Sequence, residues 1–170
     1  SARLKTHGLQ RWTYGKIEAR IKLPFQQGLW PAFWLIGDTI DYIGFPYCGE
    51  VDIMEFIDKD PTLHGTMHWQ SKDGLASYGG TIALKKPNAY HIYSIEWDTA
   101  SIKWFLDGKE YWEGSIVHNV NQTDAFHRPF YILLNLAVGG GWPGEPDKST
   151  HFPAMMYVDY VRVYERASNK

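Results

Sequence analysis

The sequence predicts an all-β fold, an antiparallel β-sandwich or jelly roll with a concave cleft on one face. Apolar and polar residues alternate with a period of two in many short segments, as they do in half-buried strands. Gly, Pro, Asn and Asp lie between these segments, as turns require, and no window of a dozen residues has a helical period. With 170 residues and neither a linker nor an internal repeat, the chain is expected to form a single domain over residues 1–170.

The predicted strands follow this alternation along the chain. The segment KIEARIKL places Ile17 and Ile21 on one face and Glu18 and Arg20 on the other, which predicts a strand with one solvated face. The same reasoning predicts strands at Leu29–Ile36, Glu50–Ile57, His64–Gln70, His91–Asp98, Ser101–Leu106, Lys109–Glu113, Phe130–Val138 and Met156–Glu165. Asp107 and Gly108, between two of these strands, predict a two-residue hairpin turn.

Composition excludes several classes of partner. The net charge is -2 and no run of like charges occurs, so we expect neither nucleic acid nor an anionic membrane surface as a partner. The longest apolar stretches, such as Tyr131–Val138, are far shorter than the roughly 20 residues that span a bilayer. Cys48 is the only cysteine and is expected to be a small buried residue. Aromatic residues make up 16% of the chain, more than a core of this size needs, so some rings should line a surface.

The segment GEVDIMEFID places three carboxylates in an otherwise apolar strand. In a regular strand Glu50 and Asp52 share one face, whereas Glu55 points to the opposite, apolar side. Burying an unpaired carboxylate there would cost several kcal/mol or force it to take up a proton. A β-bulge around Ile53 and Met54 would absorb one residue and return Glu55 to the face of the other two acids. We therefore predict a bulge and a row of three acids on one concave face.

Three acids on one face suit glycoside hydrolysis, which needs one ionised and one protonated carboxyl group beside the scissile bond. At a rise of about 3.3 Å per residue, the Cα atoms of Glu50 and Glu55 lie about 13 Å apart. Two inward-leaning side chains can bring the carboxyl groups to the roughly 5–5.5 Å separation of a retaining enzyme. Asp52 would then share a proton with the nucleophile and tune the coupled titration. A calcium site or a solvated strand face would also accommodate acids, and both alternatives stay open at this point.

Long segments of the chain resemble a known family. GEVDIMEFID, YGKIEARIKLPFQQGLWPAFWLIG, HGTMHW, NLAVGGGWPG and YVDYVRVYE are similar to motifs of glycoside hydrolase family 16, the first to its E-x-D-x-x-E signature. The bulged signature resembles the laminarinase branch, endo-β-1,3-glucanases on a β-jelly roll, whereas lichenases typically have a form one residue shorter. The resemblance implies that Glu50 is the nucleophile, Asp52 its assistant and Glu55 the general acid/base. We expect a secreted, monomeric retaining endo-β-1,3-glucanase that acts on β-glucan and requires no cofactor.

The ends of the chain carry two further implications of this resemblance. Family members have additional N-terminal strands before the segment that resembles SARLKT, so the sandwich is expected to lack those strands and to leave an edge unpaired. Arg3 resembles the family's substrate-side arginine. Asp159 resembles a ligand of a structural calcium whose other ligands come from that N-terminal part, so the sequence supplies only this one.

Aromatic and polar residues around the acids are candidates for substrate binding, because sugar rings present apolar C–H faces. Trp30 and Trp34 share a strand face in GLWPAFWL and are expected to form a stacking floor, although either could pack in the core. Trp142 lies in the Gly-rich segment GGGWPG, where a loop position favours a subsite wall. Asn135 interrupts the apolar run YILLNLAV, and facing the cleft would supply the partners that its amide needs.

Two histidines and a glutamine alternate on the segment HGTMHWQ. His68 and Gln70 are expected to meet the acids from a neighbouring strand and to donate hydrogen bonds to Glu55 or to the sugar. A zinc site is not expected, because His64 and His68 lie four residues apart on a strand and no third ligand is evident.

Two other functions fit the same pattern. The same chemistry could act on mixed-linkage β-1,3-1,4-glucan or on a galactan, because the loops around the cleft determine which glycosidic linkage is cleaved. A sugar-binding sandwich without turnover would also use aromatic platforms, but it has no need for three crowded acids.

Overall fold

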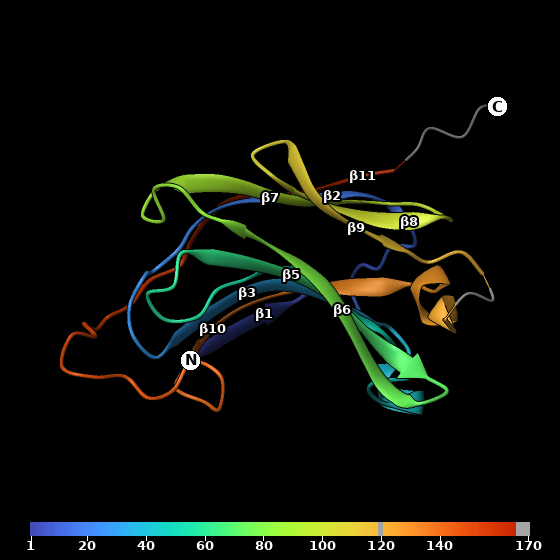
Figure 1. Ribbon diagram of the computed structural model, residues 1–170, viewed down its shortest axis with the longest axis horizontal. Coiled ribbons are helices and arrows are strands. Elements are labelled where there is room, and N and C mark those ends of the chain that lie inside the picture. Colours follow the sequence, from blue (N-terminus) through green and yellow to red (C-terminus); the bar gives the residue numbers. More distant parts are fainter. Residues whose placement is uncertain (119–120, 166–170) are drawn as a thin grey trace.

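The computed structural model describes residues 1–118 and 121–165, and it confirms an all-β sandwich of two antiparallel sheets. Figure 1 shows the sheets as two layers. The buried core residues come from strands of both sheets. In order across the first sheet, the strands are β1 (Ala2–Lys5), β10 (Phe130–Val138), β3 (Leu29–Gly37), β4 (Glu50–Glu55), β5 (Thr62–Ser71) and β6 (Gly74–Ala83). The second sheet contains β11 (Tyr157–Tyr164), β2 (Gly15–Lys22), β7 (Tyr90–Trp97), β8 (Ser101–Leu106) and β9 (Lys109–Ser115).

Helices are short in the described part of the chain. The helix α1 covers Ile40–Ile43, between β3 and β4, and the 3₁₀ helix η1 covers Thr123–His127, before β10. Neither is long and apolar enough to cross a membrane.

The alternation predicted for β2 is confirmed for its apolar face, but Glu18, predicted on the solvated face, is buried beside Lys16 and Tyr164. Ile17 and Ile21 are buried in the core between the sheets, while Arg20 lies on the opposite face. The predicted hairpin is also confirmed, because Asp107 and Gly108 both have positive φ angles and connect β8 directly to β9. Cys48 is fully buried, as expected.

The prediction missed two strands, β1 and β6. The strand β1 has only four residues, so its alternation of Ala2 and Leu4 with Arg3 and Lys5 is too short to be distinguished from a loop. The strand β6 contains Gly79 and Gly80, and glycines in sequence indicate turns. In the fold these glycines permit close packing: a Cβ at Gly79 would meet the Gly65 carbonyl oxygen at 2.6 Å, and one at Gly80 would meet the Trp112 ring.

The strands β1 and β11 are the outermost strands of their sheets on the same side of the sandwich. Leu4 is 70% exposed, and Val158 and Val161 are also exposed. Leu4 and Val161, together with Leu134 of β10, line an apolar groove of about 450 Å³ that separates the two edges.

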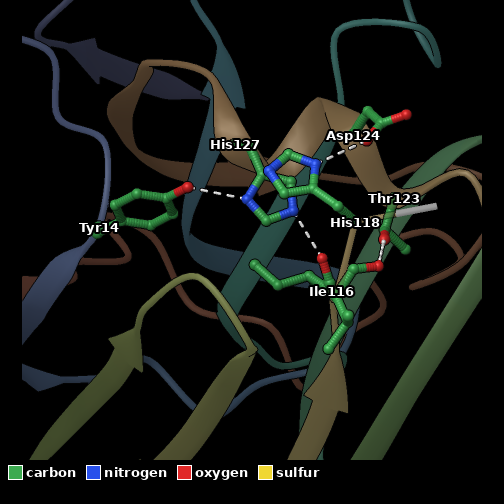
Figure 2. A network of polar contacts seen from close by, with 7 residues as sticks. Tyr14, Ile116, His118, Thr123, Asp124 and His127 are labelled. Carbon is green, nitrogen blue, oxygen red and sulfur yellow. Dashed lines mark hydrogen bonds and ion pairs between the residues drawn. The ribbon is translucent and has the colours of Figure 1, made fainter. Parts of the chain in front are cut away.

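A histidine network fixes η1 to the rest of the sandwich. Figure 2 shows His127 between two partners: its Nε2 donates to the Ile116 carbonyl at 2.6 Å, and its Nδ1 lies 2.8 Å from the Tyr14 hydroxyl. The ring of His118 stacks on His127 with centroids 3.7 Å apart, and its Nδ1 lies 3.0 Å from Asp124. This network belongs to the end of the sandwich and involves none of the three acids.

Candidate active site

The strand β4 contains the predicted β-bulge. On the β3 side, Phe33 pairs with Met54 and the next residue, Trp34, pairs with Asp52, which leaves Ile53 without a partner. On the β5 side, the register also shifts between Asp52 and Glu55. Ile53 and Met54 are both buried in the core as a result. The bulge therefore returns Glu55 to the face that carries the other two acids.

Two residues outside β4 support this bulge. The indole Nε1 of Trp104, on β8 in the opposite sheet, donates a hydrogen bond of 2.8 Å to the backbone carbonyl of Asp52. Gly65 of β5 lies between the partners of Asp52 and Glu55. A Cβ there would meet Tyr111 Oη and would lie 2.5 Å from Trp104 Cδ1. Neither role was predicted, because both depend on contacts across the core that leave no local pattern in the sequence.

The three acids lie at different depths and have different partners. Asp52 is 3% exposed and Glu55 is 8% exposed, whereas Glu50 is only partly buried. Trp30 Nε1 donates a hydrogen bond of 3.0 Å to Glu55 Oε1. His68 lies opposite Glu50 on β5, and its Nε2 is 3.2 Å from Asp52 Oδ2. This last contact is an ion pair when His68 is protonated, and the buried Oδ2 of Asp52 has no hydrogen-bond partner among the described residues.

Burial raises the pKa of all three carboxyl groups to about 8. For Glu50 and Glu55 the negative charge of Asp52 is a second cause of this rise. Opposing effects come from His68, which lowers the pKa of both glutamates, and from the Trp30 hydrogen bond, which lowers that of Glu55. Because the charges are coupled, the cluster retains protons near neutral pH rather than ionising completely.

The acids open into a cleft of about 220 Å³. Its lining includes four predicted binding residues in addition to the acids, namely Arg3, Trp30, Trp34 and Asn135. Trp34 Nε1 donates to Asn135 Oδ1 at 2.7 Å, and Asn135 Nδ2 donates to the Trp30 carbonyl at 3.4 Å. The guanidinium of Arg3 lies 5.7 Å from the Trp34 ring centroid. These contacts hold the two indoles and the amide on one wall of the cleft.

Trp142 and His64 extend the site beyond Glu55. The ring of Trp142 contacts Trp30 and His64 edge-on, with centroids 5.3 and 5.1 Å away, and Trp142 is 44% exposed. His64 pairs with Glu55 across β4 and β5, and its Nε2 is buried without a hydrogen-bond partner among the described residues. The sequence reasoning did not assign a role to His64. The sequence contains a pattern that predicts its position, because His64 and His68 lie four residues apart on one strand and therefore on the same face.

The other two predicted residues lie away from the acids. Gln70 donates to the Ser71 carbonyl at 2.7 Å and lines a different depression near η1, so it contacts none of the three acids. Asp159 lies on β11 in the other sheet, where its Oδ2 accepts a hydrogen bond of 2.7 Å from Arg20. A guanidinium at this distance repels a second cation, so the contact does not fit calcium ligation by Asp159.

Comparisons with known proteins agree with this geometry. A family model described as "Glycosyl hydrolases family 16" matches residues 1–162. The chain is 42% identical over 169 residues to the clotting factor G alpha subunit of Tachypleus tridentatus, covering 99% of this chain and 25% of that protein. It is 39% identical over 179 residues to a β-glucanase of Rhodothermus marinus, covering 96% of this chain and 62% of that protein. The chain thus spans less than two thirds of either relative.

A solved structure gives the same result in three dimensions. The laminarinase catalytic domain of Thermotoga maritima superposes with a TM-score of 0.88 at 42% identity, covering 98% of this chain and 70% of that one. The match includes the whole sandwich and therefore both sheets and the strand that carries the acids. On the family model and these similarities together, the chain belongs to glycosyl hydrolases family 16.

Proposed function

We propose that this chain is the catalytic domain of a retaining endo-β-1,3-glucanase that cleaves laminarin-type β-glucan. The observation that carries the proposal is the bulge of β4, which sets Glu50, Asp52 and Glu55 on one face of a cleft. The bulged signature resembles the laminarinase branch, and the similar structure from Thermotoga maritima is named a laminarinase.

The proposed reaction is a double displacement in which each glutamate has one role. Glu50 attacks the anomeric carbon, and the glycosidic C–O bond breaks while Glu55 gives its proton to the leaving oxygen. Glu55, now ionised, takes a proton from a water molecule, which attacks the anomeric carbon and releases Glu50. The product keeps the anomeric configuration of the substrate, and the two carboxyl groups return to their starting protonation states.

The electrostatics of the cleft support these assignments. A pKa of about 8 keeps Glu55 protonated near neutral pH, as a general acid requires. Glu50 has to be ionised to attack. Burial raises its pKa to about 8 as well, and the nearby His68 acts in the opposite direction and favours the ionised form. The indole of Trp30 donates to Glu55 and thereby stabilises the carboxylate that acts as base in the second step.

Asp52 and His68 are proposed to position and tune the nucleophile. Asp52 lies between the glutamates, and its charge raises the pKa of both. His68 Nε2 lies 3.2 Å from Asp52 Oδ2. A change in the protonation of either group therefore changes the pKa of Glu50, although neither group contacts the sugar. Trp30, Trp34 and Trp142 are proposed to stack on sugar rings along the cleft.

Four parts of the proposal concern the protein as a whole. We infer that residues 1–170 form a single domain, that the location is secreted, that the state is monomeric and that the chemistry needs no cofactor. Neither a nucleic acid nor a membrane is proposed as a partner, since the net charge is -2. Analytical ultracentrifugation tests the monomer, and activity that survives EDTA tests the absence of a metal requirement.

The deciding experiment compares polysaccharides and the variant Glu50→Ser. Laminarin should release reducing ends as a ladder of oligosaccharides, with lichenan and agarose as comparison substrates. Proton NMR during early hydrolysis should detect the retained anomer first. Exclusive cleavage of agarose would overturn the glucan assignment. If Glu50→Ser binds laminarin and releases reducing ends as the parent does, the chain is a binding module and the catalytic proposal fails.

A further inference from the structure

The floor of the cleft gathers donor atoms of the kind that bind metals. Glu50, Asp52 and His68 each offer one ligand atom, and these atoms lie within 4.8 Å of one another. The group is not simply an acidic cluster, because it includes an imidazole nitrogen. In addition, Asp52 Oδ2 is buried, lacks a hydrogen-bond partner among the described residues and faces this imidazole.

We propose that Glu50, Asp52 and His68 form an inhibitory site for a transition-metal cation such as Zn²⁺. The ion would lie on the carboxylate that attacks the sugar and would exclude the substrate from the cleft. Inhibition rests on the proposed glycosidase function, whereas binding of the ion does not.

The distance between two of the ligand atoms matches zinc coordination, and the third ligand atom lies within 4.8 Å of both. Zinc bonds of about 2.0–2.2 Å to nitrogen and oxygen place tetrahedral ligand atoms about 3.4 Å apart. His68 Nε2 and Asp52 Oδ2 are already 3.2 Å apart. The side chain of Glu50 is only partly buried and therefore has room to complete the third position. The fourth position opens into the cleft, where a water molecule can bind.

The second ring nitrogen of His68, Nδ1, has a hydrogen-bond partner, as the non-ligating nitrogen of metal-binding histidines usually does. His68 Nδ1 lies 2.6 Å from the hydroxyl oxygen of Ser77 on β6. When Nδ1 carries the proton and donates to this oxygen, Nε2 keeps its lone pair toward Asp52. Such outer partners orient the ring and raise its basicity as a ligand. Ser77 would therefore contribute to metal affinity without touching the metal.

The ligand set favours some cations over others. One imidazole and two carboxylates suit Zn²⁺ or Cu²⁺, whereas Ca²⁺ and Mg²⁺ prefer six or more oxygen ligands. An ion on Glu50 occupies the carboxylate that has to reach the anomeric carbon, so ion and sugar exclude one another at this point. The inhibition should accordingly be competitive with laminarin and reversible by EDTA.

The binding test uses isothermal titration calorimetry of the chain with ZnCl₂, and with CaCl₂ for comparison. We expect one Zn²⁺ per chain and no comparable heat from Ca²⁺. Asp52→Asn and His68→Gln should each weaken Zn²⁺ binding by more than about 10-fold, and Ser77→Ala by about 10-fold. Circular dichroism verifies that each variant is folded, and Ser77→Ala, at a surface hydroxyl, changes the fold least.

Two histidine–carboxylate pairs elsewhere provide matched controls. His118 lies beside Asp124 (Figure 2), and His91 lies 2.7 Å from Asp107 on the second sheet. His118→Gln and His91→Gln should leave Zn²⁺ affinity unchanged. Loss of binding in either control, or unchanged binding in Asp52→Asn, would show an adventitious ion only and would overturn the proposal.

The kinetic test separates this inference from the proposed function. Competitive inhibition by Zn²⁺ supports both, while inhibition that laminarin does not relieve contradicts the placement of the ion. If the chain hydrolyses no glucan but binds Zn²⁺ through Asp52 and His68, the proposed function fails and the metal site stands.

Discussion

Replacing Trp104 with phenylalanine tests whether the bulge, rather than the acids alone, produces the activity. The indole Nε1 donates to the Asp52 carbonyl from the opposite sheet, and Trp104 is fully buried. Phenylalanine keeps an apolar ring in the core but removes this donor. Leaving a buried carbonyl without its partner costs about 1–3 kcal/mol, which the backbone can avoid by relaxing the bulge. Relaxation would move Glu55, which lies three residues beyond Asp52.

The expected kinetic effect is larger than the effect on stability. A displacement of about 1 Å between reacting groups reduces the rate by about 100-fold, so we expect kcat of Trp104→Phe to fall by roughly 10- to 100-fold. KM should change little, because Trp104 lies in the core and does not line the cleft. The assay measures reducing ends released from laminarin, together with urea unfolding of the same protein.

Trp97→Phe is the matched control for this experiment. Trp97 is also buried, and its Nε1 donates a hydrogen bond of 3.0 Å to the Phe126 carbonyl, away from the bulge. It should therefore lose a similar free energy of unfolding, about 1–3 kcal/mol, with kcat within a few-fold of the parent. Equal losses of kcat in the two variants would refute the proposed link between Trp104 and the position of Glu55.

Three further predictions concern the same strand and its neighbours. The folded-state pKa of Glu50 is raised from 4.5 to about 8, so stability is highest below pH 4.5 and falls as pH rises to about 8. Glu50→Gln should therefore be more stable than the parent at pH 8 and equal to it at pH 4 in urea unfolding; a parallel pH dependence would contradict this. Trp30→Phe removes a bond that lowers the pKa of Glu55, so the basic limb of kcat/KM should move to higher pH, and an unmoved limb would exclude Glu55 as the acid. Gly65→Ala should lose about 1–3 kcal/mol of stability by thermal unfolding, while Gly141→Ala, which meets no atom within 4 Å, should lose less than about 0.5 kcal/mol.

Features that depend on neighbours in the sequence could be predicted. The alternation of β2 is local, and so is the conflict that places Glu55 on the wrong face of a regular strand. The bulge follows from that conflict because a buried, unpaired carboxylate is costly. Trp30 and Trp34 share a parity, and the structure places both on the cleft wall.

Features that depend on the partner sheet could not be predicted. Trp104 resembles any core residue of its strand, and only the packing of the two sheets brings its N–H to the bulge. Gly80 resembles a turn residue, although it provides space for the ring of Trp112 within a regular strand. Gln70 lies on the same face of β5 as His68. The twist of the sheet turns this face progressively along the strand, so Gln70 lies beyond the acids and lines a different depression.

The geometry of β4 also explains why the acids can differ in role although burial raises the pKa of each to about 8. A regular strand would separate the third acid from the other two and would give it neither their charges nor the cleft. With the bulge, the charge of Asp52 raises the pKa of both glutamates, whereas His68 lowers the pKa of both and the Trp30 hydrogen bond lowers that of Glu55. One extra residue in a strand thus brings the acids together on one face, as a double displacement requires of its two carboxyl groups.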